Sequence, residues 1–267
     1  MGSLETISGL IIDMDGVLWH GDRAQVGLVE FFATLRELKL RFILATNNAS
    51  LTAQQYVDKL AAMGVQVGID EILTSGMATA NYLAEQFVPQ QTRVFVIGGI
   101  GARQPLQDLG FTLSDLYPDT PPHLVVCGLD KALSYDKLAT ATLCISQGAA
   151  FFATNADTTL PTERGLAIGN GSILAALTTA TAVKPTVIGK PEPIIYQQAM
   201  AILGTPASET VAIGDRLDTD ILGAVRTGIR SIMVLTGISS VSDIDGLDYA
   251  PTRIVEDIQT ISQMLRG

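Results

Sequence analysis

The chain has 267 residues, of which 47% are hydrophobic and 16% are charged, and its formal net charge is −10. This composition is typical of a globular protein with room for two modest domains, and it excludes a disordered chain. The negative charge argues against nucleic acid and anionic membranes as partners, because both are bound mainly through Lys and Arg. A phosphorylated substrate is not excluded, because one bound dication can reverse the local electric field.

The cysteines and the N-terminal segment bear on where the protein works. Cys127 and Cys144 lie in apolar stretches without a C-x-x-C spacing, which predicts buried, reduced thiols. Residues 1–9 lack the basic region and long apolar run of a secretory signal. No apolar stretch of the sequence is long enough to span a bilayer. We therefore expect a cytoplasmic protein without a membrane partner.

Short apolar runs alternate with amphipathic stretches along the chain. The runs predicted to be buried strands are, in order, 9–12, 41–45, 94–97, 124–127, 150–153, 186–188, 210–213 and 231–235. Helices are predicted over 52–63, 134–146, 172–182 and 193–203. The last of them begins at Pro193 and is followed by Gly204, which is a common pair of helix boundaries. Continuous apolar strands that alternate with helices predict an α/β fold with parallel sheets covered on both faces.

Four of the predicted strands end at residues that are able to act on a phosphate or a metal ion. These ends are Asp13-Met14-Asp15-Gly16, Thr46-Asn47-Asn48, Gly189-Lys190-Pro191 and Gly214-Asp215. In open parallel sheets, ligands bind outside the carboxyl ends of the strands. The four ends could therefore converge on one crevice, although the sequence alone does not order the strands.

The pair Asp13 and Asp15 predicts a metal site. Side chains two residues apart in a strand share a face, so both carboxylates are expected to point the same way. Two carboxylates this close repel each other, which raises a pKa or demands a cation, and Asp215 adds to the crowding at this site. Mg²⁺ suits it because this ion prefers a few carboxylate oxygens together with water and substrate phosphate.

The same residue types can divide the work of phosphoryl transfer. One carboxylate can attack phosphorus and form an aspartyl-phosphate, while its neighbour protonates the leaving oxygen and later deprotonates water. Lys190 can place a positive charge beside the transferring oxygens, and Thr46 and Asn47 can donate neutral hydrogen bonds to them. With only His20 and His123 in the chain, a Ser-His-Asp or Cys-His set has little support.

The motifs, in this order, resemble those of the haloacid dehalogenase superfamily of phosphatases. The similarity is closer to the NagD-like branch (subfamily IIA), which includes 4-nitrophenyl phosphatases, phosphoglycolate phosphatases and nucleotide monophosphatases. It covers nearly the whole chain, and four ordered motifs are far more specific than one Asp-x-Asp. The segments that carry it are Asp13-Met14-Asp15-Gly16-Val17, Thr46-Asn47-Asn48, Lys190-Pro191, Gly214-Asp215-Arg216-Leu217-Asp218-Thr219-Asp220, Ala153-Thr154-Asn155 and Gly169-Asn170-Gly171-Ser172.

This resemblance implies a Rossmann-like, doubly wound parallel sheet as the catalytic core, formed by residues 1–79 and 185–267. It also implies a large α/β cap domain at residues 80–184, inserted between the second and third motifs, that selects the substrate. The Pro-containing junction near 183–185, between a predicted helix and a predicted strand, agrees with that boundary.

The resemblance also implies a role for each motif residue. Asp13 would be the nucleophile and Asp15 the general acid/base, which would in addition bind Mg²⁺ through its backbone carbonyl. Asp215 would be a further metal ligand beside Asp13, and Asp220 would support the metal from outside its ligand shell, with Asp218 as a rival for that role. The residues implied to bind the substrate phosphate are Thr46, Asn47, Asn48 and Lys190.

The predicted function is Mg²⁺-dependent hydrolysis of small phosphomonoesters, with sugar phosphates, phosphoglycolate, nucleotide monophosphates and 4-nitrophenyl phosphate as candidate substrates. The alternative is a phosphoaspartate-forming regulatory or ligand-binding protein without turnover, because response-regulator folds also carry an acidic cluster and a lysine at strand ends. Asp15 and the cap-sized insertion favour turnover, since a cap can enclose a substrate and exclude water. Phosphotransferase or phosphonatase activity and a homo-oligomeric state are left open.

Two further segments have competing interpretations. A strand followed by Gly98-Gly99-Ile100-Gly101 hints at dinucleotide binding, but Gln104 stands where the third glycine of the pattern belongs, so such a site is not expected. Asn155 and Asp157 follow a predicted cap strand. They are expected either to select substrates or to cap a loop.

Overall fold

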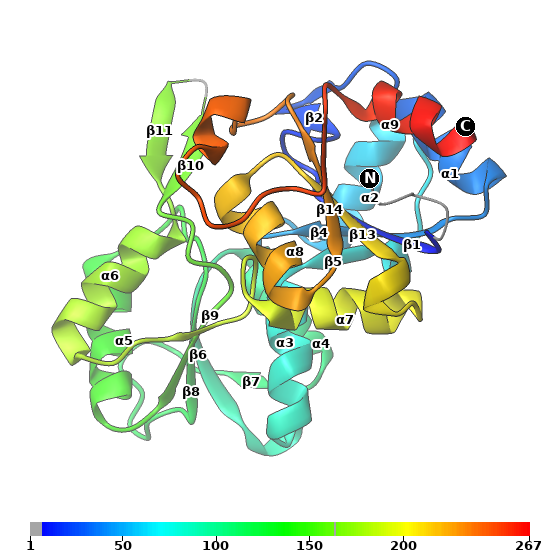
Figure 1. The fold of residues 1–267 in the computed structure, drawn as a ribbon. Coiled ribbons are helices and arrows are strands. Elements are labelled where there is room, and N and C mark those ends of the chain that lie inside the picture. Colours follow the sequence, from blue (N-terminus) through cyan, green and yellow to red (C-terminus); the bar gives the residue numbers. More distant parts are fainter. Residues whose placement is uncertain (1–6, 163) are drawn as a thin grey trace. The chain divides into compact units, whose positions relative to one another are not determined.

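The structure is a computed structural model that describes residues 7–162 and 164–267; Figure 1 shows its fold. Residues 1–6, part of the segment in which we looked for a secretory signal, lie outside the described residues. The chain divides into two compact units, each described below by itself. The first unit comprises Met1–Thr46, Gln54–Leu73 and Lys190–Gly267, and the second comprises Asn47–Ala53 and Thr74–Gly189.

The first unit is built on a six-stranded sheet with the strand order β15-β14-β13-β1-β4-β5. Strand β1 pairs in parallel with β4 on one side and with β13 on the other, so that Gly9 lies opposite both Arg41 and Thr210. All four residues of β1 are buried, as expected for a central strand of a parallel sheet. The strands are β1 (Gly9–Ile12), β4 (Arg41–Thr46), β5 (Ile72–Thr74), β13 (Thr210–Gly214), β14 (Arg230–Val234) and β15 (Arg253–Val255).

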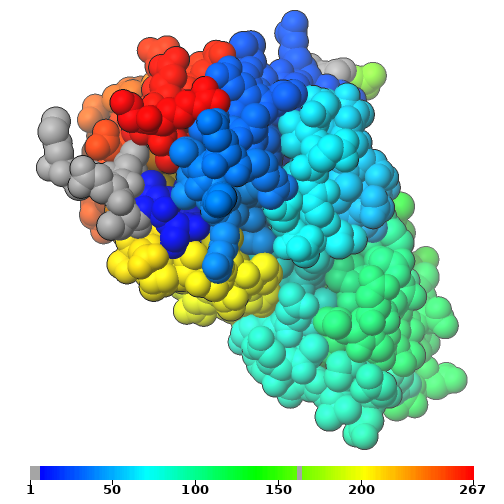
Figure 2. Space-filling model, turned by 90° about the vertical axis from the view of Figure 1, so that its right-hand side faces the viewer, coloured from blue at the N-terminus to red at the C-terminus, as the bar shows by residue number. Residues whose placement is uncertain are grey.

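Helices cover both faces of this sheet. Helices α7 and α8 lie along one face, and α1, α2 and α9 lie along the other (Figure 1). Figure 2 shows the C-terminal helix α9, in red, against the blue segment that contains α1, and Arg266 of α9 forms an ion pair with Glu30 of α1 at 3.2 Å. The helices are α1 (Leu28–Glu37), α2 (Ala53–Ala62), α7 (Pro193–Leu203), α8 (Leu222–Thr227) and α9 (Ile258–Arg266).

The second unit has its own five-stranded parallel sheet, in the order β12-β9-β8-β6-β7. An antiparallel hairpin, β10 (Thr159–Thr162) and β11 (Gly165–Ile168), is separate from it. The sheet strands are β6 (Arg93–Ile97), β7 (Thr112–Leu113), β8 (Leu124–Cys127), β9 (Ala150–Ala153) and β12 (Thr186–Val187). The helices are α3 (Ser75–Gln86), α4 (Ile100–Asp108), α5 (Tyr135–Ser146) and α6 (Asn170–Thr181).

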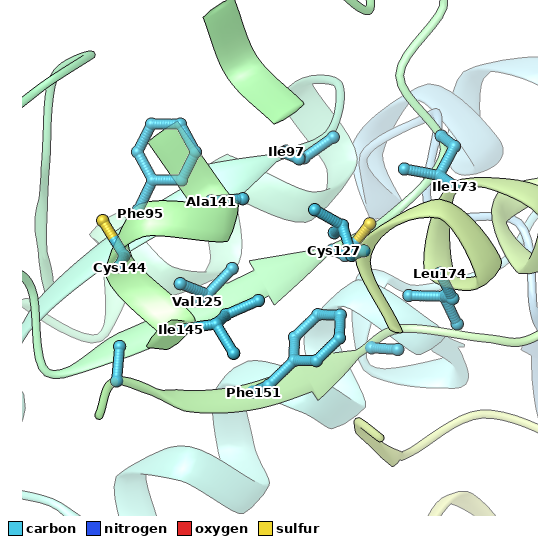
Figure 3. Close-up of a cluster of buried hydrophobic side chains, with 13 residues drawn as sticks. Phe95, Ile97, Val125, Cys127, Ala141, Cys144, Ile145, Phe151, Ile173 and Leu174 are labelled. Atoms are coloured by element: carbon cyan, nitrogen blue, oxygen red, sulfur yellow. The ribbon is translucent and has the colours of Figure 1, made fainter. Parts of the chain in front are cut away.

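A hydrophobic core joins one face of the second sheet to helices α5 and α6 (Figure 3). Both cysteines belong to it, as predicted: Cys127 and Cys144 are buried and free. Burial raises the pKa of the Cys127 thiol, so the thiol stays protonated, and its Sγ donates to Asn170 Oδ1 at 3.3 Å. The buried members are Phe95, Ile97, Val125, Cys127, Ala141, Cys144, Ile145, Ala149, Phe151, Ala153, Ile173, Leu174 and Leu177.

The remaining elements are short. A hairpin of β2 (Trp19–His20) and β3 (Arg23–Ala24) follows β1. The single-turn elements are η1 (Ile69–Glu71), η2 (Pro89–Gln91), η3 (Ala207–Glu209), η4 (Leu217–Ile221, a π-helical turn) and η5 (Val241–Ile244). Among the described residues, no helix has the length and apolar character needed to cross a membrane.

The predicted fold class, α/β with a doubly wound parallel sheet, is confirmed, and each predicted apolar run forms a strand. One expectation about strand placement is wrong. The core boundary at residue 185, which the family resemblance implies, assigns the run at 186–188 to the same unit as the strands that begin at residues 9, 41 and 210. Instead β12 pairs with β9, with Thr186 opposite Phe152, and so belongs to the sheet of the second unit.

Candidate active site

Three of the four motif-bearing strand ends meet at one edge of the first sheet. Asp13 follows β1 and Asp215 follows β13, and these strands are parallel neighbours in which Ile12 lies opposite Ile213. The amide of Asp13 continues the pairing by donating to the Ile213 carbonyl at 2.8 Å. Thr46 ends β4, the neighbour of β1 on its other side. The edge of the sheet beyond β1 is therefore a switch point, where open α/β folds bind ligands.

A buried cluster of three carboxylates lies at this edge. Asp13, Asp215 and Asp220 each offer an oxygen, and the three oxygens lie within 4.8 Å of one another. The residues are 9%, 1% and 2% exposed, so water screens their mutual repulsion poorly. Such a cluster is strongly destabilising unless cations balance it.

Lys190 supplies one of these cations. Its Nζ donates to Asp13 Oδ1, to Asp220 Oδ1 at 2.7 Å and to the Ala45 carbonyl at 3.0 Å. Burial favours the neutral amine, but the Asp13 and Asp220 carboxylates outweigh that effect and raise the pKa of Lys190, so it stays charged. Lys190 stands three residues before α7, not at the end of a strand of this sheet.

Asp215 is the least satisfied member of the cluster. Its Oδ2 accepts a hydrogen bond from the Ile238 amide at 2.8 Å, whereas its Oδ1 is buried without a partner among the described residues. Burial and the nearby Asp220 raise its pKa to about 7. Gly237 passes so close that a side chain there would collide with the Asp215 carboxylate. Gly237 thus leaves room for the Asp215 carboxylate. One oxygen of this carboxylate, Oδ1, is open to a ligand.

The two candidates for the supporting role, Asp218 and Asp220, lie in different environments. Asp220 Oδ2 accepts from the Arg216 amide at 3.1 Å, and its backbone carbonyl accepts from the Tyr196 hydroxyl at 2.9 Å. Asp218 has a side chain that is 66% exposed and pairs with the Arg216 guanidinium at 2.8 Å. The π-helical turn η4 therefore buries one carboxylate in the cluster and turns the other towards solvent.

Asp15 lies outside the cluster of three. Strand β1 ends at Ile12, so the face-sharing rule for strands does not apply to Asp13 and Asp15. Asp15 is exposed, and its Oδ1 accepts a hydrogen bond from the Trp19 indole Nε1 at 2.9 Å. An isolated backbone bridge also joins the two residues. The chain beyond β1 is therefore a tight turn that fixes the Asp15 carboxyl group through Trp19.

Two aromatic residues around these motifs were not anticipated. Trp19 is fully buried, and its ring stacks on that of Tyr56 with centroids 6.3 Å apart. The Tyr56 hydroxyl hydrogen-bonds with the Thr46 side chain, and burial raises the pKa of Tyr56, which keeps the phenol neutral. Helix α2 thereby supports both Asp15 and Thr46. The sequence gives little sign of this, because an aromatic residue on a helix resembles any other core residue.

Asn47 and Asn48 belong to the second unit. Asn47 is 8% exposed, and its Nδ2 lies 3.2 Å from each carboxylate oxygen of Asp157. Asn48 Oδ1 accepts from the amide and the hydroxyl of Ser50, at 3.0 and 2.6 Å, which is a local turn. The phosphate-binding roles expected of these two residues stay predictions.

The carboxylate cluster fits a divalent cation that prefers oxygen ligands. Three carboxylates and one ammonium leave a formal charge of −2, which one dication neutralises. The buried, unpartnered Asp215 Oδ1 is the direct sign of a missing partner. All the available donors are hard oxygens, as Mg²⁺ requires, without the histidine or thiolate that zinc prefers.

Comparison with known proteins agrees with the motifs. A family model described as haloacid dehalogenase-like hydrolase matches residues 10–112, and a second, described as HAD-hydrolase-like, matches residues 187–261. The 5′-nucleotidase YutF of Bacillus subtilis is 37% identical over 255 residues, which is 96% of this chain and 97% of that protein. An acid sugar phosphatase of Staphylococcus epidermidis is 38% identical over 93% of this chain and 94% of its own.

A solved structure is similar over the full length. The glycerol phosphate phosphatase of Mycobacterium tuberculosis, determined in complex with magnesium, has a TM-score of 0.90 and 36% identity, and the match covers 100% of this chain and 80% of that one. The motif residues, the fold and these relatives agree. This chain belongs to the haloacid dehalogenase-like hydrolase family, in the NagD-like branch of phosphatases.

Proposed function

We propose that this protein is a Mg²⁺-dependent phosphatase that hydrolyses small phosphomonoesters through an aspartyl-phosphate on Asp13. The observation that carries the proposal is the buried cluster of Asp13, Asp215 and Asp220 held by Lys190 at the carboxyl end of the first sheet. A carboxylate beside a buried ammonium and an open cation site suits attack on a charged phosphorus centre.

In the first step, Asp13 attacks phosphorus. Lys190 holds Asp13 Oδ1, which leaves Oδ2 as the attacking atom. As the O–P bond to Asp13 forms, the bond from phosphorus to the leaving oxygen breaks, and Asp15 donates a proton to that oxygen. Trp19 orients the Asp15 carboxyl group for this transfer through its indole N–H.

In the second step, Asp15 takes a proton from water, whose oxygen attacks phosphorus. The bond from phosphorus to Asp13 breaks, and inorganic phosphate is released. Asp13 and Asp215 would hold Mg²⁺, Asp15 would add its backbone carbonyl, and Asp220 would fix Lys190. When bound, Mg²⁺ supplies positive charge that keeps the carboxylates ionised and draws the substrate phosphate towards Asp13.

The second unit is proposed to act as the cap that selects the leaving group, and Thr46, Asn47, Asn48 and Lys190 to bind the phosphate. We expect small phosphorylated metabolites in the cytoplasm as substrates and no nucleic acid as a partner. The named activities of the relatives suggest nucleoside monophosphates, sugar phosphates and glycerol phosphate as the first compounds to measure.

The test is phosphate release from a panel of these phosphomonoesters, phosphoglycolate and 4-nitrophenyl phosphate, ranked by kcat/KM. Activity should require Mg²⁺ and be abolished by EDTA. The isosteric Asp13→Asn variant should lose activity by roughly 10³-fold or more, because it removes the nucleophile. Asp218→Asn, in which an exposed carboxylate is changed, is the matched control and should keep most of the activity. Retained activity in Asp13→Asn would contradict the nucleophile assignment.

The same measurements separate turnover from the regulatory alternative. A phosphorylated protein that persists for hours without multiple turnover on any panel member would identify a phosphoacceptor rather than a phosphatase. The presence of Asp15 and Trp19 beside the nucleophile favours turnover, because a phosphoacceptor has no need of an oriented proton donor.

A further inference from the structure

The segment Thr154–Asp157, which follows β9, contacts two places where the chain passes between the two units. The Gly189 amide donates to the Thr154 carbonyl at 2.9 Å, and Asn155 Nδ2 donates to the Asn47 carbonyl at 2.9 Å. Gly189 is joined by one peptide bond to Lys190, and Asn47 by one peptide bond to Thr46. The two residues that this segment contacts, Gly189 and Asn47, are thus each bonded directly to a residue of the proposed catalytic set.

Asn47 is fixed at several points within the second unit. Its carbonyl also accepts from the buried Ser75 hydroxyl at 2.6 Å, and its side-chain amide meets both oxygens of Asp157 at 3.2 Å. A side chain at Gly189 would collide with Asn47 Oδ1 and with the Thr154 carbonyl. Only glycine at position 189 therefore allows the chain just before Lys190 to lie against Asn47.

The segment itself is held by the beginning of α6. Asn170 is 2% exposed, and its Nδ2 donates to the carbonyls of Asn155 at 2.7 Å and Cys127 at 3.1 Å. The Gly171 amide donates to the Asp157 carbonyl at 2.8 Å. These contacts form a hydrogen-bonded chain from helix α6 through the Asn155–Asp157 turn to Asn47, buried at Asn170 and Asn155 and half-buried at Asp157. Such networks are stabilising when every member is paired and become costly when one partner is removed.

We infer that Asn155 and Asp157 are positioning residues that act through Asn47, rather than residues that select the leaving group. Both Asp157 carboxylate oxygens and the Asn155 side-chain N–H group are engaged with Asn47. Their effect therefore falls on the motif Thr46-Asn47-Asn48, which is proposed to bind the phosphate common to every substrate. The inference rests on the proposed phosphatase function. It assigns the two sequence segments around Asn155 and Asn170 to the support of the catalytic motif.

A double-mutant cycle between Asp157 and Asn47 tests the inference. Asp157→Ala should lower kcat/KM by roughly 10- to 100-fold and by the same factor for every phosphomonoester, because the lost hydrogen bond involves a charged group. Asp157→Asn, which keeps one acceptor oxygen, should lose less. The double variant Asn47→Ala/Asp157→Ala should be no worse than Asn47→Ala alone. The matched control is Asp119→Ala, at an exposed position of the same unit, which should keep wild-type values.

Two kinetic outcomes would overturn the inference. A loss that differs more than tenfold between substrates would show that Asp157 selects the leaving group. Additive losses in the double variant would show that Asp157 acts independently of Asn47.

A second measurement does not depend on turnover. Hydrogen–deuterium exchange in the peptide that spans residues 44–50 should be faster in Asp157→Ala than in the wild type and unchanged in Asp119→Ala. Unchanged exchange there in Asp157→Ala would overturn the positioning role even in an inactive protein. If the wild type hydrolyses no panel member but Asp157→Ala still exchanges faster than the wild type, only the proposed function is contradicted.

Discussion

At the scale of single residues, Trp19 both packs in the core and holds the carboxyl group of Asp15, the proposed general acid/base. Its ring is fully buried and stacks on Tyr56, and its indole N–H donates a hydrogen bond to Asp15 Oδ1 at 2.9 Å. Lys59 Nζ lies 4.7 Å from the centroid of the same ring, which is a cation–π contact. The exposed carboxyl group that we propose as the general acid/base is thus held by a fully buried side chain.

We predict that Trp19→Phe lowers kcat by about tenfold or more while the protein remains folded. Phenylalanine keeps an aromatic ring for Tyr56 but has no N–H, so the Asp15 carboxyl group loses its orienting hydrogen bond, worth about 1.5–3 kcal/mol when the acceptor is charged. Steady-state kinetics would measure the loss. The thermal unfolding midpoint would report the smaller packing defect separately. Unchanged kcat with reduced stability would mean that the indole serves packing alone.

The residue types of the site could be predicted from the sequence, but their partners could not. Asp13, Asp215 and Lys190 were expected together, and the structure brings them together with Asp220. The expectation for Asp15 relied on strand geometry beyond the point where the strand ends. Trp19 and Tyr56 escaped notice because their supporting contacts arise only from tertiary packing.

At the scale of elements, the start of α5 shows how a loop is locked to a helix. Ser134 caps the helix as its side chain accepts from the Lys137 amide at 3.3 Å. Lys137 Nζ then reaches back to Asp130 Oδ2 at 2.8 Å and to the Ala132 carbonyl at 2.9 Å. Burial alone would raise the pKa of Asp130, but the hydrogen bonds from Lys137 and the Ala132 amide outweigh it and lower the pKa.

This pair predicts a pH-dependent contribution to stability. A lowered pKa in the folded state stabilises the protein above the ordinary value of 3.8, and the contribution is lost as the pH falls through the lower folded-state value. Lys137→Met should therefore reduce the free energy of unfolding by about 1 kcal/mol at pH 7 and by much less near pH 3. Denaturant unfolding at both pH values measures the difference. The neighbouring exposed Lys131→Met is the control, and a loss independent of pH would contradict the mechanism.

The long buried strands were predictable, since buried parallel strands are continuous apolar runs. Helices α2, α5, α6 and α7 were predicted as well, whereas α1, α3, α4, α8 and α9 were not. Helix α7 runs from Pro193 to Leu203, as its flanking residues suggested. The error at β12 has a physical cause: apolar strands of different parallel sheets have the same composition, and only their pairing tells them apart. Hairpin β10–β11 was not foreseen because its apolar residues Leu166 and Ile168 are exposed instead of buried.

At the scale of the whole molecule, a cation in the carboxylate cluster links catalysis to stability. It would tie the chain after β1 to the chain after β13, so ion binding should stabilise the folded state. We predict that Mg²⁺ at 100 times its dissociation constant raises the free energy of unfolding by about 2.7 kcal/mol, seen as a higher thermal midpoint.

The Asp215→Asn variant should separate the effect of the Asp215 charge on stability from the effect of the bound ion. In EDTA at pH 8 it should unfold at a higher temperature than the wild type, because a buried, poorly compensated carboxylate has been removed. It should also show no Mg²⁺-dependent rise. A variant that is less stable than the wild type in EDTA, or that still responds to Mg²⁺, would contradict the role of Asp215 as the open ligand.

The pairing of β1 with β13 has a consequence for the order in which the protein matures. Gly9 finds its partner Thr210 only after the second unit, up to Gly189, has been synthesised in between. The second unit has a core of its own from nearby segments and can fold while the chain is still growing, whereas the central strand of the first unit must wait. Asp13 is therefore synthesised well before Asp215, and the nascent chain carries the proposed nucleophile before the carboxylate cluster can form around it. The proposed site is completed only after the second unit has been made.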